Sequence, residues 1–424
     1  MLKTLKNAWG IPELRKKILF TLMILLLYRI GNVIPVPYID VASLKTYFDS
    51  VLSSTILGLY NAMSGSAFSQ ATVLALSIQP YINASIIIQL LTIAIPALER
   101  MAKEEGEEGK KKINLITRYT TVGLGLLMGW AYYMMLNNYG IVTEEGFLPG
   151  LVIVLTFAAG SAVVMWLGEQ INEYGIGNGI SMILFANIIS SIPATVNTLF
   201  SLFTAKTWWQ PIVIIIGMAA LVLFIIFIND AERRIPVQYA KRVVGRKIYG
   251  GQSTNLPIKV AMSGVMPVIF AQSICSLPAT ICTFIGIGEG NWWYDNLWSA
   301  KSWMYAVVYG LMIFFFSWFY STIQYDPVEI GNNLKKNGGF IPGFRPGKPT
   351  ADFIKKVINK IVVFGAVYLA IVALLPIVAG NLMDSVNSLA IGGTSVIIVV
   401  GVALETVKAL EAQMLMRHYK GFLD

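Results

Sequence analysis

The sequence has few charged residues for its length. Asp, Glu, Lys and Arg make up 13% of its 424 residues, whereas hydrophobic residues make up 56%. A soluble globular protein usually carries about 25% charged residues. A chain with half that share has too little polar surface to be covered by water on every side. The composition therefore excludes an ordinary soluble protein and requires a lipid bilayer as part of its surroundings.

Cysteine and histidine are also nearly missing. Cys275 and Cys282 are the only cysteines, and their spacing excludes a disulfide framework and a CxxC site. The single histidine, His418, follows the last apolar run, so a Ser–His dyad or a zinc site within the membrane lacks its histidine. No GxxxxGK[ST] motif is present, which excludes a phosphate-binding loop of an ATP motor. We expect no catalytic residue, metal, cofactor or direct nucleotide binding.

Ten apolar segments are long enough to cross a bilayer as helices. Crossing about 30 Å of hydrocarbon at about 1.5 Å per residue takes roughly 20 mostly apolar residues. The segments cover residues 18–36, 72–96, 113–136, 151–170, 180–203, 211–229, 258–285, 303–323, 353–378 and 393–412. No small-residue cleavage site follows the first segment, so we expect a retained helix there instead of a signal peptide. The sequence predicts an all-α polytopic membrane protein with ten transmembrane helices.

Basic residues are divided unequally between the two sides of this arrangement. Loops and termini of one side hold 28 Lys and Arg residues, whereas the other side holds only Lys45, Lys206 and Lys301. Because cytoplasmic loops carry the excess of basic residues, both termini are predicted to be cytoplasmic. Arg29 is the remaining basic residue and lies within the first helix. The net charge of +9 is thus spread over short loops, which does not favour nucleic-acid binding.

Residues 38–70 lie on the outer side and break the helical pattern. Their last part, 58–70, is moderately apolar, rich in small residues and too short to span. A re-entrant element can lie at membrane depth only if protein or a water-filled cavity surrounds it. The residues alone favour an ordinary external loop over such an element.

Two cytoplasmic loops, 231–257 and 324–350, are unusually long and basic. The first predicts a hairpin that turns at Gly245, and the second predicts a helical turn followed by a Gly/Pro-rich loop that presents Arg345. Basic residues near helix ends orient a membrane protein and contact anionic lipid. Long loops on one face are also typical of a docking surface for a soluble partner. The residues leave both interpretations open.

Ionisable residues within the apolar segments are rare. A secondary transporter of a small solute uses such residues near the bilayer midplane, and Arg29 is nearly the only candidate here. This scarcity favours a conduit whose cargo is not an ion. The transporter, and a scaffold that only gathers membrane partners, are the alternatives.

Six segments have distinctive sequences: residues 29–37 (RIGNVIPVP), 76–90 (LSIQPYINASIIIQL), 166–181 (WLGEQINEYGIGNGIS), 252–260 (QSTNLPIKV), 340–347 (FIPGFRPG) and 392–395 (GGTS). These segments closely resemble the SecY family, whose members form the pore of the bacterial Sec protein-translocation channel. The resemblance runs in one order from about residue 10 to about residue 415. It implies two pseudo-symmetric, inverted five-helix halves, an N-terminal half over 1–205 and a C-terminal half over 206–424.

The resemblance also implies a central constriction and a plug. The constriction would be a pore ring of Ile78, Ile82, Leu184, Ile269 and Ile398. Water is unfavourable in a narrow apolar constriction, so ions would have to lose their hydration shells to pass through it. The stretch 58–70, with Gly58, Asn61, Ser64, Gly65 and Ser66, matches the plug that blocks the channel at rest. This replaces the interpretation of 58–70 as an ordinary loop.

A lateral gate and docking residues follow from the same resemblance. Helices 2 and 3 would face helices 7 and 8 across the gate, with Asn83, Gln89, Gln272 and Ser273 as its polar lining. Arg242 and Arg246 in the first cytoplasmic loop and Arg345 in the second would engage the SecA ATPase or the ribosome, which supply the energy. SecE-type and SecG-type subunits, signal-sequence-bearing polypeptides and membrane lipid are the other implied partners. The implied function is translocation of unfolded polypeptides across, and release of membrane segments into, the bacterial cytoplasmic membrane.

Overall fold

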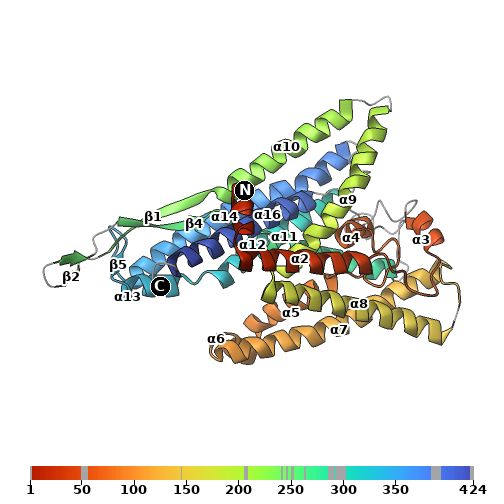
Figure 1. Cartoon of the computed structure of the whole chain (residues 1–424), viewed down its shortest axis with the longest axis horizontal. Coiled ribbons are helices and arrows are strands. Elements are labelled where there is room, and N and C mark those ends of the chain that lie inside the picture. The colour runs from red at the N-terminus through yellow and green to blue at the C-terminus, as the bar shows by residue number, and fades with distance from the viewer. Residues whose placement is uncertain are drawn as a thin grey trace.

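The protein is built almost entirely of helices, and most of the long ones run along the long axis of the molecule (Figure 1). The computed structural model describes residues 2–48, 56–144, 146–204, 209–239, 242–244, 247–249, 253–261, 264–284, 292, 302–382 and 393–420. The helices are α1 (Leu2–Trp9), α2 (Pro12–Gly31), α3 (Val41–Tyr47), α4 (Ile56–Ser64), α5 (Gln79–Ala94), α6 (Pro96–Lys103), α7 (Gly106–Asn138), α8 (Phe147–Tyr174), α9 (Gly179–Thr204), α10 (Trp209–Asp230), α11 (Met266–Phe284), α12 (Trp303–Gln324), α13 (Pro327–Lys336), α14 (Lys348–Leu382) and α16 (Gly393–Lys420).

Each of the ten predicted spans overlaps one of these helices, but two spans begin later than predicted. The helix expected from residue 72 begins at Gln79, because Ala71 and Ser77 adopt positive φ angles and the chain between them forms turns. Pro80 then stands in the first turn, where its missing N–H costs nothing. The helix expected from residue 258 begins at Met266, because its first residues belong to a strand.

Length and composition single out the clearest membrane spans. Among the described residues, α8, α9, α10, α14 and a segment that begins with α12 are long and apolar enough to cross a bilayer. A sixth span is the pair α5 and α6, which is bent by 106° just before Pro96. The apolar part of α11, Met266–Pro278, is shorter than these spans. Large apolar side chains such as Leu223 and Phe227 point outward, as expected for helices in lipid.

Helices α7 and α8 form a closely packed pair. Gly125 and Gly129 lie one turn apart on α7, and a Cβ atom on Gly125 would come within 2.6 Å of the Ser161 hydroxyl of α8. Small residues at this spacing let two backbones approach closely inside a membrane. At the far end of the pair, the Arg118 guanidinium binds both carboxylate oxygens of Glu169 at 2.9 Å. This bidentate pair fixes the relative position of the two helices.

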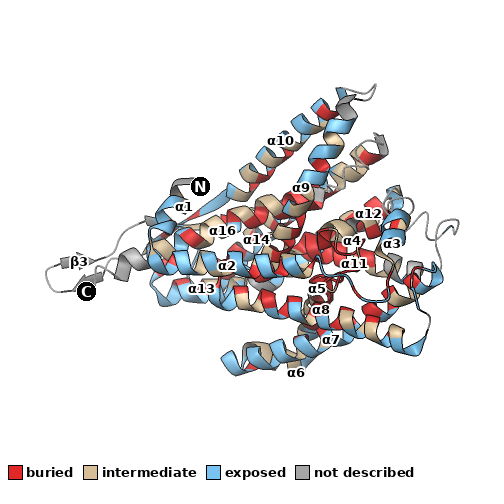
Figure 2. Cartoon of the chain, turned by 45° about the vertical axis from the view of Figure 1, so that its right-hand side comes forward, coloured by how far each residue is buried: buried red, intermediate tan, exposed pale blue. Residues whose placement is uncertain are grey.

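The largest hydrophobic core lies where helices of both sequence halves meet. It contains buried residues of α2, α5, α8 and α9 together with residues of α10, α11, α12, α14 and α16. Figure 2 shows that buried residues gather on the inner faces of the helices, whereas exposed residues lie on the outer faces. The middle of the molecule is therefore apolar and closely packed.

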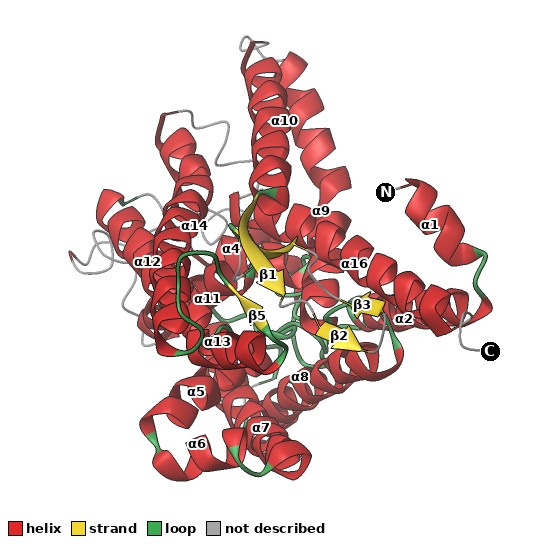
Figure 3. Cartoon of the chain, turned by 90° about the vertical axis from the view of Figure 1, so that its left-hand side faces the viewer, coloured by secondary structure: helices red, strands yellow, loops and turns green. Residues whose placement is uncertain are grey.

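The two long basic loops join in one small sheet at one end of the helices (Figure 3). Strand β1 (Glu232–Tyr239) pairs antiparallel with β4 (Ser253–Lys259) and with β5 (Gly339–Phe340). The buried side chains of Ile235 and Val237 in β1 pack in one cluster with Ile354 and Ile358 of α14. The predicted hairpin strands pair as β2 (Arg242–Val244) and β3 (Lys247–Tyr249), and the predicted turn residue Gly245 lies outside the described residues.

The first and last helices of the chain, α1 and α16, lie side by side. Figure 1 places α6, α13 and the strands toward one end of the molecule, and α3 toward the other. Helix α1 lies against α16, where the Thr4 hydroxyl donates to a Glu411 carboxylate oxygen at 3.0 Å. The buried Ala8 and Leu410 belong to one apolar cluster.

Candidate functional site

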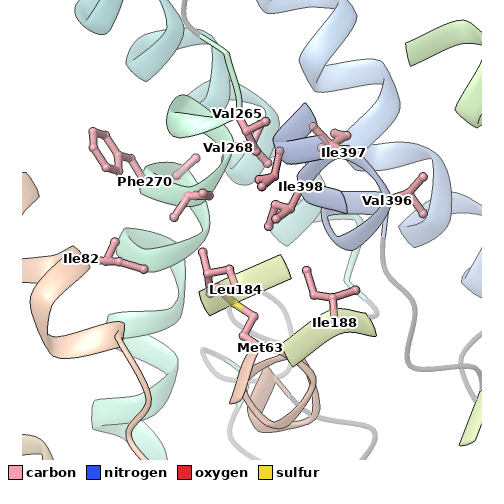
Figure 4. Close-up of a cluster of buried hydrophobic side chains, with 14 of the residues drawn as sticks. Met63, Ile82, Leu184, Ile188, Val265, Val268, Phe270, Val396, Ile397 and Ile398 are labelled. Atoms are coloured by element: carbon pink, nitrogen blue, oxygen red, sulfur yellow. The ribbon is translucent and has the colours of Figure 1, made fainter. Parts of the chain in front are cut away.

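All five residues of the predicted pore ring belong to the largest hydrophobic core, and each is at most 1% exposed. They are Ile78 and Ile82 at the start of α5, Leu184 on α9, Ile269 on α11 and Ile398 on α16. Figure 4 shows Ile82, Leu184 and Ile398 arriving from three different elements around a common centre. The structure thus brings the five side chains into one apolar cluster. Their role as a seal stays a prediction.

The start of α5 determines how Ile78 and Ile82 are presented. Ile78 is the residue before the helix, and its carbonyl accepts the Ile82 amide at 3.1 Å, so the two side chains share one face. Gly168 of α8 lies beside Ile78, because a Cβ atom there would be in van der Waals contact with the Ile78 Cδ1 at 3.4 Å. Residues of the segment 72–78 are mostly buried, so this non-helical backbone is covered by protein, as a membrane interior requires.

The predicted plug, residues 58–70, is a short helix and a tight turn packed inside the helices. Met63 of α4 belongs to the same core as the predicted ring and lies beside Leu184 in Figure 4. The turn is held locally, because the Ser69 amide donates to Asn61 Oδ1 at 2.9 Å and the Phe68 amide donates to Ser64 Oγ at 3.1 Å.

Backbone conformation and packing both distinguish this segment from an ordinary external loop. Gly65 and Ser66 have φ angles of +67° and +69°, which only glycine adopts without strain. The buried Tyr132 of α7 donates to the Phe68 carbonyl at 2.6 Å, and the Tyr132 and Phe68 rings stack with centroids 4.4 Å apart. Gly58 is half-buried on α4. Helix α4 thus packs against the apolar cluster through Met63, and its role as a plug stays a prediction.

The predicted gate residues differ in what they contact. Asn83, Gln272 and Ser273 are buried, whereas Gln89 is half-buried farther along α5. A hydrogen bond from Gln79 joins α5 to α11, because the Gln79 Nε2 donates to Ser273 Oγ at 3.0 Å. The sequence analysis did not include Gln79 in the gate, although it lies one turn before Asn83 on the same face of α5.

Two of the predicted docking residues, Arg242 and Arg345, lie at the end of the molecule that carries the small sheet. Arg345 is exposed, and its backbone is fixed because its carbonyl accepts the buried Thr350 hydroxyl at 2.8 Å. The neighbouring Phe344 ring stands 4.2 Å from the Phe353 ring, measured between centroids. Arg242 lies in β2, and Arg246 lies outside the described residues. These contacts hold the loop in place, and the loop presents the charged side chain of Arg345 to solvent.

Comparisons with known proteins identify the family. The SecY family model matches residues 72–407. The protein translocase subunit SecY of Streptomyces scabiei is 42% identical over 440 residues, which cover 100% of both chains. The chain belongs to the SecY family. At 40% identity, SecY of Thermotoga maritima matches 100% of this chain and 98% of its own length. Both relatives are named as translocase subunits, so they give no support to the alternative that the chain is a transporter of a small solute.

Solved structures agree with the SecY fold. The structure titled "The structure of a protein conducting channel" has a TM-score of 0.68 at 18% identity and covers 94% of this chain and 92% of its own. A second, "Sec61 in the Canine ribosome-channel complex from the endoplasmic reticulum", has a TM-score of 0.64 at 17% identity, with 94% and 92% covered. The all-α polytopic fold predicted from the sequence is confirmed by these matches and by the helices themselves.

Proposed function

We propose that the chain is the central subunit of a protein-conducting channel in the bacterial cytoplasmic membrane. The channel passes unfolded secretory polypeptides across the membrane and releases membrane segments laterally into lipid. One observation supports this proposal most strongly. In a chain that is 42% identical to a SecY over its full length, the five aliphatic residues of the pore ring lie in one buried cluster, with Met63 of the plug helix in the same core.

The chemistry of the ring suits a polypeptide conduit. Isoleucine and leucine form no directional hydrogen bonds, so a closed ring excludes hydrated ions without binding them. The same side chains can move aside around any polypeptide sequence, because no specific polar contact has to be replaced. The five residues range from Ile78 on α5 to Ile398 on α16, so movement of one half relative to the other would widen the ring.

The lateral gate would open between α5 with α7 and α11 with α12. Gln79 and Ser273 form a neutral hydrogen bond across this boundary, and the buried Oδ1 of Asn83 and Oε1 of Gln272 have no hydrogen-bonding partner among the described residues. A neutral bond contributes only about 0.5–1.5 kcal/mol net. A signal sequence entering between the helices could therefore separate them at small cost.

The orientation and the partners complete the proposal. Both termini and the basic loops would be cytoplasmic, because basic residues concentrate on the cytoplasmic side of membrane proteins. Helices α6 and α13 and the strands, which belong to the basic loops, lie toward one end of the molecule (Figure 1). The SecA ATPase or the ribosome would dock on residues 231–257 and 324–350 and supply the energy, since the chain itself is not an enzyme. A SecE-type subunit would clamp the halves 1–205 and 206–424, and a SecG-type subunit would accompany them.

Site-specific cross-linking tests the function directly. A photoreactive amino acid at Ile82 or Leu184 is expected to cross-link to a secretory polypeptide stalled during translocation. Leu223 provides the matched control, because it lies on the outer face of α10 and is 68% exposed. Cross-links at Leu223 but not at Ile82 or Leu184 would contradict a pore at the aliphatic cluster. Translocation without any cross-link to the ring positions would do the same.

A further inference from the structure

The end of the plug helix α4 is only partly capped by its own chain. The last four carbonyls of any α-helix lack partners within the helix. In α4, the Asn61 carbonyl accepts the Ser66 amide at 2.9 Å, and the Ala62 carbonyl accepts the Gly65 amide at 3.2 Å. These two bonds belong to the plug itself and move with it.

The next two carbonyls are capped by side chains from outside the plug. Asn187 of α9 donates from Nδ2 to the Met63 carbonyl at 2.7 Å, and Asn32 at the end of α2 donates to the Ser64 carbonyl at 3.4 Å. Asn187 is 0% exposed. These bonds exist only while the plug occupies its place between α2 and α9.

The Asn187 amide is the meeting point of three parts of the chain. Its Nδ2 also lies 2.8 Å from the Tyr28 hydroxyl on α2 and 3.2 Å from Ser77 Oγ in the turn before α5. The Tyr28 and Ser77 hydroxyls are 3.0 Å apart and hydrogen-bond to each other. Ser77 has a φ angle of +50°, a strained conformation that the surrounding contacts must hold. One buried amide therefore fixes the plug, α2 and the turn that leads to the pore ring.

The half-buried Arg29 lies at the same place. The Arg29 Nη1 is buried and has no hydrogen-bonding partner among the described residues. A Cβ atom on Gly65 would come within 2.6 Å of this nitrogen and 3.0 Å of the Asn187 Oδ1. The carboxyl-terminal end of a helix carries a partial negative charge, and a cation there is stabilising. The guanidinium thus packs against the turn that directly follows α4.

We propose that Asn187 is the latch that holds the plug in the closed channel, with Asn32 as a second cap and the Arg29 charge as support. The proposal rests on the channel function proposed above and names residues that control its resting state. Withdrawal of the plug breaks the bonds from Asn187 and Asn32 but leaves those within the plug intact. The latch therefore sets how often the unoccupied channel opens, and Asn187 acts as a positioning residue.

Resting conductance of the full-length chain, reconstituted with its partner subunits in planar bilayers, tests the latch. Asn187→Leu keeps the side-chain size but removes the amide, and we expect the open fraction without substrate to rise about tenfold, which corresponds to about 1.4 kcal/mol. Tyr28→Phe should have a smaller effect, because it leaves the bond to Met63 in place. Asn197→Leu is the matched control, since Asn197 is exposed on the same helix, and it should leave the conductance unchanged.

A second measurement reports on the plug itself. In a chain whose two cysteines are replaced by alanine, Ala62→Cys should react faster with a membrane-impermeant maleimide from the outer side when Asn187→Leu is also present. If Asn187→Leu fails to insert, Asn32→Leu carries the same two tests. Unchanged conductance and labelling, with normal motor-driven export, would overturn the latch and leave the channel function standing. Absence of export by the wild-type complex would instead overturn the channel function.

Discussion

Substitution of Gly160 should disturb both stability and closure, because this glycine of α8 lies directly against the segment that leads to the pore ring. A Cβ atom at Gly160 would overlap the Val73 carbonyl oxygen and come within 2.9 Å of the Val73 carbonyl carbon. The obstructing atoms are backbone on both sides, so no side chain can rotate away. Overpacking of this kind costs about 1–3 kcal/mol, and we expect Gly160→Ala to lie near the upper end.

The overlap at Gly160→Ala can lower the stability of the fold or displace residues 73–78, and each outcome can be measured. Loss of about 3 kcal/mol should lower the unfolding temperature by roughly 3 °C, which tryptophan fluorescence in detergent can measure. Displacement of residues 73–78 would move Ile78, so resting conductance in planar bilayers should also rise. Gly123→Ala is the matched control, because a Cβ there meets nothing within 4 Å and alanine is the better helix former. Wild-type stability and conductance for Gly160→Ala would refute the close packing of α8 on this segment.

Two further predictions concern the ring and the docking loop. Simultaneous replacement of Ile82 and Ile269 by glycine removes two buried side chains of the proposed ion barrier, so resting conductance should rise well above that of the wild type; equal conductance would argue against the ring. Arg345→Glu reverses an exposed charge without touching the core, so ATP-driven export of a reporter should fall strongly while the chain still inserts. Normal export with the glutamate variant would remove Arg345 from the docking surface.

The helical fold was predictable because bilayer thickness sets the length of an apolar run. The beginning of α5 was not, since residues 72–78 are as apolar as a helix and only the positive φ angles of Ala71 and Ser77 interrupt it. Hydropathy carries no information on such conformations. The last two residues of the strand Ser253–Lys259 were likewise predicted as the start of a helix, because the pairing of this strand with β1 cannot be read from the local hydropathy.

The candidate site was predictable only through family resemblance. Each ring residue is, on its own, one more isoleucine or leucine in an apolar helix, and only the motif match singles it out. The polar contacts around the ring were not predicted, for a different reason. The Gln79–Ser273 bond and the Asn187 cap on the plug join residues 194 and 124 positions apart, and no local pattern signals such a pair.

The shared sheet has a mechanical consequence. Strand β1 is hydrogen-bonded to β4 on one side and to β5 on the other, so the two long basic loops cannot shift independently. Strand β4 ends at Lys259, and α11, which carries Ile269, begins at Met266. A force applied at either loop is therefore shared by both loops. The short chain segment between Lys259 and Met266 transmits it to α11 and so to Ile269 of the proposed pore ring.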